Sequence, residues 1–179
     1  MGVLTPTYFD KEKGNTMKIL IAYAGKTGVT ERCAKQLAKE CTTATLANLN
    51  EKQVSPENFD LIVVGSPVYS HKLEPSVKYF IKDNEKSLQE KQFAVFVTMV
   101  EEDTFDKVIA HEIPESLRQR AFAMQQFGGE VNDLTSFGWH DRLVAKAMVK
   151  LESKKHPIAL RLEALLDFAK ILKEKEVKK

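Results

Sequence analysis

Continuous apolar runs that alternate with segments of helical periodicity constrain the fold of this chain more than any other feature. The clearest run is FDLIVVGS, in which every residue from Leu61 to Val64 is apolar. Such a run is typical of a strand that is buried on both faces of a parallel sheet. The expected strands cover residues 17–23, 43–49, 59–66, 91–100 and 120–127. The expected helices cover residues 30–41, 75–88, 104–119, 138–153 and 158–175.

The order of these segments predicts an α/β fold with a five-stranded, doubly wound parallel sheet. Helices are expected on both faces, with an extra helical insertion near the C-terminus. Residues 17–179 are expected to form one domain, and the polar residues 1–16 a loosely ordered N-terminal extension. The acidic residues 101–103 are expected to be a solvated helix start with Asp103 as N-cap, and Pro114 is expected to interrupt that helix.

The composition excludes several classes of protein. The 27 Lys and Arg nearly balance the 25 Asp and Glu among 179 residues, without the basic and aromatic alternation of a nucleic-acid-binding protein. No apolar run approaches the ~18–20 residues of a membrane span, and no secretory signal is evident. Cys33 and Cys41 are separated by about 12 Å of helical rise, so no disulfide is expected and a cytoplasmic location fits. These cysteines and the four histidines lack metal-ligand spacing, so no metal site is expected.

The first expected strand runs directly into a small, hydroxyl-rich loop with the sequence AGKTGVT. Its glycines allow tight turns, its threonines offer hydroxyl donors, and the N–H groups of the next helix favour an anion. The loop is neither a Walker loop nor the dinucleotide-binding fingerprint. The alternative is that Thr30 only caps the helix. The residues of this predicted phosphate site are Ala24, Gly25, Lys26, Thr27, Gly28, Val29 and Thr30.

The segment Thr-Gly-x-Thr-Glu at 27–31 resembles the FMN phosphate loop of the flavodoxin family. The chain departs from that loop at Gly25, where the family has a hydroxyl side chain. The resemblance implies FMN as the cofactor and a flavodoxin-like sheet with the strand order 2-1-3-4-5. In such a sheet, ligands bind beyond the carboxyl ends of the strands, where the strand order reverses.

The resemblance also implies that two later loops hold the flavin ring. The loop GSPVYSH would cover one face, with Tyr69 stacked on the ring, unless Tyr69 packs on a neighbouring helix instead. On the other face Met99 and Val100 stand where flavodoxins often have an aromatic residue, which implies a more open flavin there. His71 is a weak catalytic candidate that would act if its charge lay near flavin N1, and a surface or packing role is the alternative. The implied ring contacts are Pro67, Val68, Tyr69, Ser70, Thr98, Met99 and Val100.

The segment after residue 129 is one that an electron-carrier flavodoxin does not need. It holds the only tryptophan, Trp139, and then an amphipathic helix. The basic stripe of this helix consists of Arg142, Lys146, Lys150 and Lys154. Its apolar side consists of Leu143, Val144, Ala147, Met148 and Leu151. The apolar side either packs on the sheet, with the lysines in water, or the helix docks on an anionic membrane or acidic partner, and both can hold.

Trp139, Asp141 and Arg142, with the spaced lysines that follow, resemble the late motif of one flavodoxin branch, the menaquinone-dependent protoporphyrinogen IX oxidases. The similarity spans residues 17–172. It implies a quinone as electron acceptor, a bulky organic substrate such as a porphyrinogen, and association with the inner face of the membrane. The role of the three motif residues does not follow from the sequence.

Three functions are compatible with these patterns. The first is an FMN-dependent oxidoreductase that passes hydrogen from an organic substrate to a quinone. The second is a one-electron carrier that docks on redox partner proteins. Such carriers usually present a strongly acidic surface, which the charge balance does not favour, although acidic residues could cluster at 101–106. The third is a module on the same scaffold that binds no cofactor.

Overall fold

The central sheet has the strand order that the resemblance implies. In the computed structural model, which describes residues 16–130, 139–155 and 157–177, five parallel strands lie in the order β2-β1-β3-β5-β6. They are β1 (Ile19–Tyr23), β2 (Ala44–Asn48), β3 (Leu61–Tyr69), β5 (Gln92–Thr98) and β6 (Ala123–Gln126). The chain leaves β1 for β2 on one side and returns to β3 on the other, so the strand order reverses between β1 and β3. The predicted doubly wound α/β fold is therefore confirmed.

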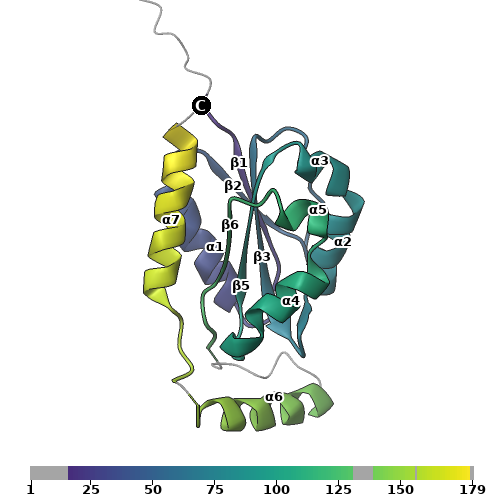
Figure 1. The fold of residues 1–179 in the computed structure, drawn as a ribbon, viewed down its shortest axis with the longest axis vertical. Coiled ribbons are helices and arrows are strands. Elements are labelled where there is room, and N and C mark those ends of the chain that lie inside the picture. The colour runs from purple at the N-terminus through teal and green to yellow at the C-terminus, as the bar shows by residue number, and fades with distance from the viewer. Residues whose placement is uncertain (1–15, 131–138, 156, 178–179) are drawn as a thin grey trace, which may run out of the picture.

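Helices cover both faces of the sheet (Figure 1). On one face lie α1 (Val29–Glu40) and α7 (Leu162–Val177). On the other face lie α2 (Pro75–Asp83), α3 (Glu85–Gln89), α4 (Phe105–Glu112) and α5 (Glu115–Arg118). Alternate residues of a strand enter the two cores. In β1, Leu20 and Ala22 pack under the second set of helices, whereas Ile19 and Ile21 pack under α1 and α7.

Three phenylalanine rings attach α7 to the sheet. Phe96 of β5, Phe127 after β6 and Phe168 of α7 are fully buried, and their ring centroids lie 5.0–6.3 Å apart. Burying each such side chain stabilises the fold by roughly 1.5–3 kcal/mol. The face of β6 that would receive an amphipathic helix is thus filled by α7.

The helix α6 (Trp139–Glu152) lies beyond the carboxyl ends of the strands, across the base of the molecule in Figure 1. Leu143 and Leu151 are 60% and 62% exposed, and Ala147 between them is exposed as well. The interpretation that this apolar side packs on the sheet is therefore wrong for these three residues, because α7 occupies the available face.

Two helix boundaries differ from the expectation and one agrees with it. The expected helix 75–88 is divided into α2 and α3 at Asn84, whose side-chain amide donates to the carbonyl of Phe80 at 2.8 Å. The break at Pro114 is confirmed, since α4 ends at Glu112 and Ile113 has an extended backbone. The prediction of Asp103 as N-cap is wrong, because Asp103 lies inside a short 3-10 turn that precedes α4.

The last expected helix, 158–175, begins only at Leu162. The chain before it runs antiparallel to the end of β6, with a bridge between Gly128 and Leu160 and a hydrogen bond from Arg161 N to Phe127 O at 2.7 Å. Backbone groups paired in this way cannot begin a helix.

The expected extension 1–16 lies outside the described residues except for Thr16. Within the described residues no helix has both the length and the apolarity needed to cross a bilayer.

Candidate functional site

The start of α1 presents unpaired backbone N–H groups at the end of β1. Its N-cap is Gly28, which has a left-handed backbone (φ 77°) and makes no side-chain capping hydrogen bond. The first helical hydrogen bond runs from Arg32 N to Gly28 O, so the N–H groups between them have no partner within the helix. The alternative that Thr30 caps the helix is wrong, because Thr30 lies inside the first turn.

Two threonine hydroxyls join the predicted phosphate loop to the end of β5. The Oγ1 atoms of Thr30 and Thr98 lie 2.8 Å apart, and both residues are buried. One hydroxyl donates to the other, which leaves a single hydroxyl proton of the pair for a further acceptor. A Cβ at position 25 would lie 3.3 Å from Thr30 Oγ1. Glycine in place of the family's hydroxyl residue therefore leaves room for the Thr30 side chain.

The segment after β3 is a hairpin and not the open loop that the sequence suggests. The strand continues through Pro67 and Val68 to Tyr69, and then pairs with β4 (Lys72–Leu73) in antiparallel register. The two turn residues, Ser70 and His71, have φ values of 49° and 61°. A two-residue turn with positive φ at both positions suits right-twisted strands, but it favours Asn and Gly, so this turn stores strain.

Contacts from the helices on the same face hold this hairpin in place. The carboxylate of Glu112 is almost fully buried and accepts a hydrogen bond from the backbone N–H of Leu73 at 3.1 Å. Its charge is balanced by Lys78 Nζ at 3.0 Å. The Ser66 hydroxyl donates to Pro67 O at 2.8 Å and accepts from the backbone N–H of Glu74 at 3.0 Å.

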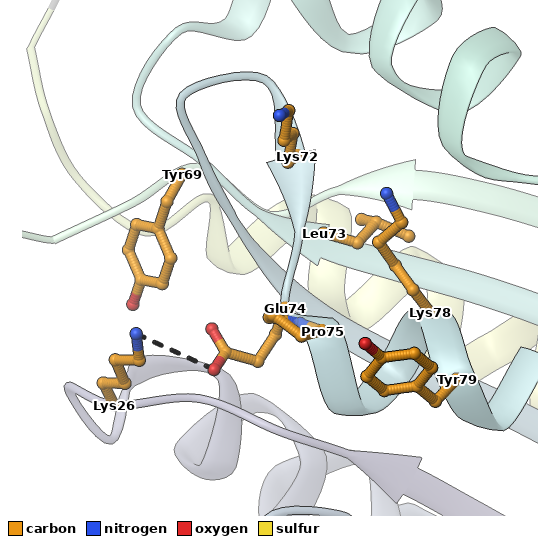
Figure 2. A pocket seen from close by; sticks show the side chains of 8 residues that line it. All are labelled: Lys26, Tyr69, Lys72, Leu73, Glu74, Pro75, Lys78 and Tyr79. Carbon is orange, nitrogen blue, oxygen red and sulfur yellow. Dashed lines mark ion pairs between the residues drawn. The ribbon is translucent and has the colours of Figure 1, made fainter.

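Tyr69 reaches from the hairpin to the phosphate loop. The pKa of its hydroxyl is raised, because the effect of burial exceeds the opposite effect of hydrogen bonds with the Thr27 side chain and the Lys26 backbone. Figure 2 shows Tyr69 and Glu74 both directed towards Lys26, whose Nζ lies 3.9 Å from Glu74 Oε1. The hydroxyl end of Tyr69 thus contacts the phosphate loop and not a neighbouring helix.

The acidic residues after β5 are each paired with a basic side chain from a distant segment. Glu101 Oε2 lies 2.7 Å from His71 Nε2 at the hairpin tip. The other two pairs are Glu102 with Arg161 at 3.3 Å and Asp103 with Lys155 at 3.7 Å. The expectation of a merely solvated acidic helix start is therefore wrong for Glu101 and Glu102, which contact the hairpin and the chain before α7, whereas Asp103 is exposed as expected.

The residues Met99 and Val100 are approached closely by the glycines that follow β6. The Met99 side chain is buried in the core, and its backbone N–H donates to Gly128 O at 2.8 Å. A Cβ on Gly129 would lie 3.0 Å from the Met99 carbonyl and from a Val100 methyl. Because it is buried in the core, the Met99 side chain cannot face a ligand in this arrangement.

The fourteen predicted cofactor residues all lie in three segments that follow β1, end β3 and end β5, and the fold brings these segments to one edge. Sequence reasoning missed the glycine pair after β6 and the pairings of the acidic residues 101–103. The two adjacent glycines were a usable signal. The charge pairs left no such signal in the sequence, because their members lie far apart in the chain. Among the described residues, no cluster of three His, Cys, Asp or Glu side chains could hold a metal ion.

A model of the flavodoxin domain family matches residues 20–158, which is most of the chain. The chain belongs to this family. The match includes the phosphate loop, the hairpin, the segment after β5 and α6.

Several solved structures are similar to this flavodoxin-domain chain. One is a flavoprotein from Lactobacillus acidophilus in complex with FMN, with 18% identity, a TM-score of 0.49, and coverage of 62% of this chain and 93% of that one. Another is oxidised flavodoxin 1 from Bacillus cereus, with 19% identity, a TM-score of 0.48, and coverage of 78% and 99%. A flavodoxin from Fusobacterium nucleatum bound to flavin mononucleotide has 11% identity, a TM-score of 0.44, and coverage of 79% and 99%. No curated protein matches the chain.

Proposed function

We propose that this flavodoxin-domain protein is an FMN-dependent oxidoreductase that passes hydrogen from an organic substrate to a quinone. The observation that carries the proposal is the uncapped start of α1 at the point where the strand order reverses. Free N–H groups at a helix N-terminus stabilise a phosphate through hydrogen bonds and the helix dipole. A side-chain carboxylate or hydroxyl that capped the helix would occupy the same position, and Gly28 provides none.

The residues at this edge suit the phosphate of FMN. Apart from the adjacent residues of the chain, nothing lies within 4 Å of the Cβ position of Gly28, so a phosphate can approach the backbone there. The phosphate would be held by the N–H groups of residues 28–30 and by the hydroxyl of Thr27, with Lys26 adding positive charge. The hydroxyl pair of Thr30 and Thr98 has one proton to donate towards the cofactor. When bound, FMN supplies the two-electron chemistry, and the protein binds and orients it.

The flavin ring would lie between the β3–β4 hairpin and the segment that follows β5. The pair of His71 and Glu101 connects these two segments at 2.7 Å, so it defines the outer rim of such a ring site. We assign Pro67, Val68, Tyr69 and Ser70 to one side. The opposite side is assigned to Thr98, Val100 and the backbone of Met99.

Helix α6 suits a membrane surface, which is where a lipid-soluble quinone is found. Its exposed face combines Leu143, Ala147 and Leu151 with the exposed residues Lys146 and Lys150. Apolar side chains beside lysines allow a helix to lie on an anionic bilayer. Because α6 lies at the edge that carries the cofactor segments, docking through it would bring the quinone to the flavin (Figure 1). Arg142, which is half-buried, would contribute from the side of this face.

The substrate that the resemblance favours is protoporphyrinogen IX, which would place the protein in haem biosynthesis at the inner face of the membrane. The support is the motif of Trp139, Asp141 and Arg142, of which the first two side chains lie outside the described residues.

The carrier function is the less favoured alternative. The carboxylates of residues 101–103 that could attract a basic partner are each paired with a basic side chain within the chain.

Anaerobic turnover tests the proposal directly. The protein is loaded with FMN and mixed with protoporphyrinogen IX and a soluble menaquinone analogue, and porphyrin formation is followed by absorbance. The proposal expects turnover that requires both the quinone and bound FMN. Bound flavin without porphyrin formation would remove the porphyrinogen assignment, and flavin reduction by a partner protein alone would favour the carrier.

Vesicle sedimentation tests the docking of α6. The variant Leu143→Ser/Leu151→Ser is expected to lose binding to vesicles that contain anionic lipid. The matched control is Leu162→Ser/Leu166→Ser, which removes two exposed leucines from α7 and should bind as the unchanged protein does. Equal binding by both variants would contradict docking through α6.

A further inference from the structure

A pocket of about 380 Å³ opens beside the phosphate loop, on the side of the hairpin that carries α2. Its walls come from three separate segments: the phosphate loop, the β3–β4 hairpin and the first turns of α2. Figure 2 shows the side chains that line it. A volume in this range suits a small organic molecule. The predicted cofactor contacts use only Lys26 and Tyr69 of this lining.

Three lysines line the pocket and only two of them have acidic partners. Lys78 forms an ion pair with the buried Glu112 at 3.0 Å, and Lys26 lies 3.9 Å from Glu74. The side chain of Lys72 is exposed and forms no ion pair or hydrogen bond with any described residue. The pocket wall therefore carries one ammonium group whose charge is not offset, next to two others that can still donate hydrogen bonds.

Glu74 also lines the pocket, with its carboxylate directed towards Lys26, and the remaining lining is aromatic and apolar. Leu73 and Pro75 supply apolar surface, and the tyrosine rings of Tyr69 and Tyr79 stand at different sides of the pocket (Figure 2). Tyr79 is 64% exposed, so its ring is accessible to a ligand. Aromatic faces stack on planar ligands, and their position beside an ammonium group selects a ligand that is both flat and anionic.

We propose that this pocket binds a planar organic carboxylate, with the carboxylate at Lys72 and the planar part between the tyrosine rings. Because Lys26 and Tyr69 also belong to the predicted cofactor contacts, the bound acid would lie beside the flavin, as a planar acidic substrate or product of the enzyme. That last step rests on the proposed function. The binding itself does not, since none of the lining groups needs FMN in order to act.

Titration calorimetry with 2-naphthoate tests the pocket, with 2-naphthamide as the uncharged probe of the same shape. Both are titrated into the full chain, once without and once with FMN. The substitution Lys72→Glu reverses the unpaired charge. Its matched control is Lys86→Glu on α3, an exposed lysine outside the pocket lining that undergoes the same change in net charge.

For Lys72→Glu we expect a loss of naphthoate affinity of at least about 10-fold, against less than about 2-fold for Lys86→Glu. Naphthamide should bind more weakly than naphthoate and should not distinguish the two variants. Tyr79→Ala should weaken both probes, because it removes the exposed ring. Equal effects of the two lysine variants, or equal binding of the acid and the amide, would overturn the proposal.

The same titrations separate this proposal from the proposed function. Charge-selective naphthoate binding by a protein that retains no FMN would leave the pocket in place and remove the flavin enzyme. Normal FMN binding without charge-selective naphthoate binding would remove the pocket alone. FMN affinity should be the same in Lys72→Glu and in Lys86→Glu.

Discussion

The two halves of the candidate cofactor site are built in different ways. The phosphate side consists of seven consecutive residues, 24–30, whose shape is fixed by one left-handed glycine and the start of one helix. The ring side is held by pairs that are distant in sequence, such as His71 with Glu101 and Glu102 with Arg161. Local backbone chemistry determines the first half, whereas tertiary contacts determine the second. A single backbone change should therefore disable the phosphate side, while the ring side should respond gradually.

Gly28→Val should produce the largest effect. A β-branched residue is strained at φ 77°, so the first turn of α1 would be displaced from the phosphate position. We expect FMN affinity to fall by at least about 100-fold, measured by quenching of flavin fluorescence. Gly25→Ala is the matched control. Its methyl group would meet Thr30 Oγ1 at 3.3 Å, a contact that a small shift relieves, and the loss should be less than about 10-fold.

The phosphate side was largely predictable from the sequence, and the reason is the same locality. A buried strand, two glycines and a helix start are adjacent in the chain, and their geometry follows from turn chemistry. The strand order followed from the β–α alternation together with the resemblance, since few topologies remain once crossovers are right-handed. Even here one detail was missed, because the partner of the Thr30 hydroxyl, Thr98, is 68 residues away.

The ring side and α6 could not be predicted in the same way. The hairpin turn at Ser70 and His71 has none of the Asn or Gly residues that announce such a turn. Packing of α6 on the sheet was excluded by Phe168, which belongs to a helix later in the chain. In both cases the deciding contact is made by a residue that local patterns do not connect to the element.

The cysteines within α1 and at its C-cap, Cys33 and Cys41, should report how firmly the helix behind the phosphate loop is packed. Burial raises the pKa of both Cys33 and Cys41 from 9.0 to about 11. At pH 8 the thiolate fraction is then about 100-fold smaller than for an ordinary thiol, and reaction with a disulfide reagent should slow accordingly. Reaction at the rate of the urea-unfolded chain would show that α1 is loosely packed.

The same pKa values predict how stability depends on pH. A thiol whose pKa is raised in the folded state favours the folded state fully below its unfolded value, near 9, and loses this contribution as pH rises to about 11. Urea midpoints should fall over this interval. The fall should be smaller in Cys33→Ala/Cys41→Ala, which serves as the control for the tyrosines and lysines that titrate in the same range.

Thr98→Val should have an intermediate effect, because it breaks the one hydroxyl contact between the two halves. The buried Thr30 hydroxyl would lose its partner, at a cost of about 1–2 kcal/mol in the free energy of unfolding. Urea denaturation measures this change. In the double variant Thr30→Val/Thr98→Val the loss should be smaller than the sum of the single losses, since neither hydroxyl remains unsatisfied. Additive losses would contradict the pairing.

Changes at the hairpin tip should have the smallest effects. Ser70→Asn places a residue that tolerates positive φ at the first turn position, so it should stabilise the fold by about 0.5 kcal/mol. His71→Gln removes the imidazole partner of Glu101 and should weaken FMN binding by only about 2–3-fold. A loss as large as that of Gly28→Val would show that the rim, and not the helix start, dominates cofactor binding.

The most direct test of the account compares the affinities of the protein for FMN and for riboflavin, which lacks the phosphate. If the uncapped start of α1 holds the phosphate, FMN should bind at least about 100-fold more tightly than riboflavin. In Gly28→Val the ratio of the two affinities should collapse towards one, because only the ring contacts remain. Equal affinities in the unchanged protein, or a ratio that Gly28→Val leaves intact, would contradict the assignment of residues 24–30 to the phosphate.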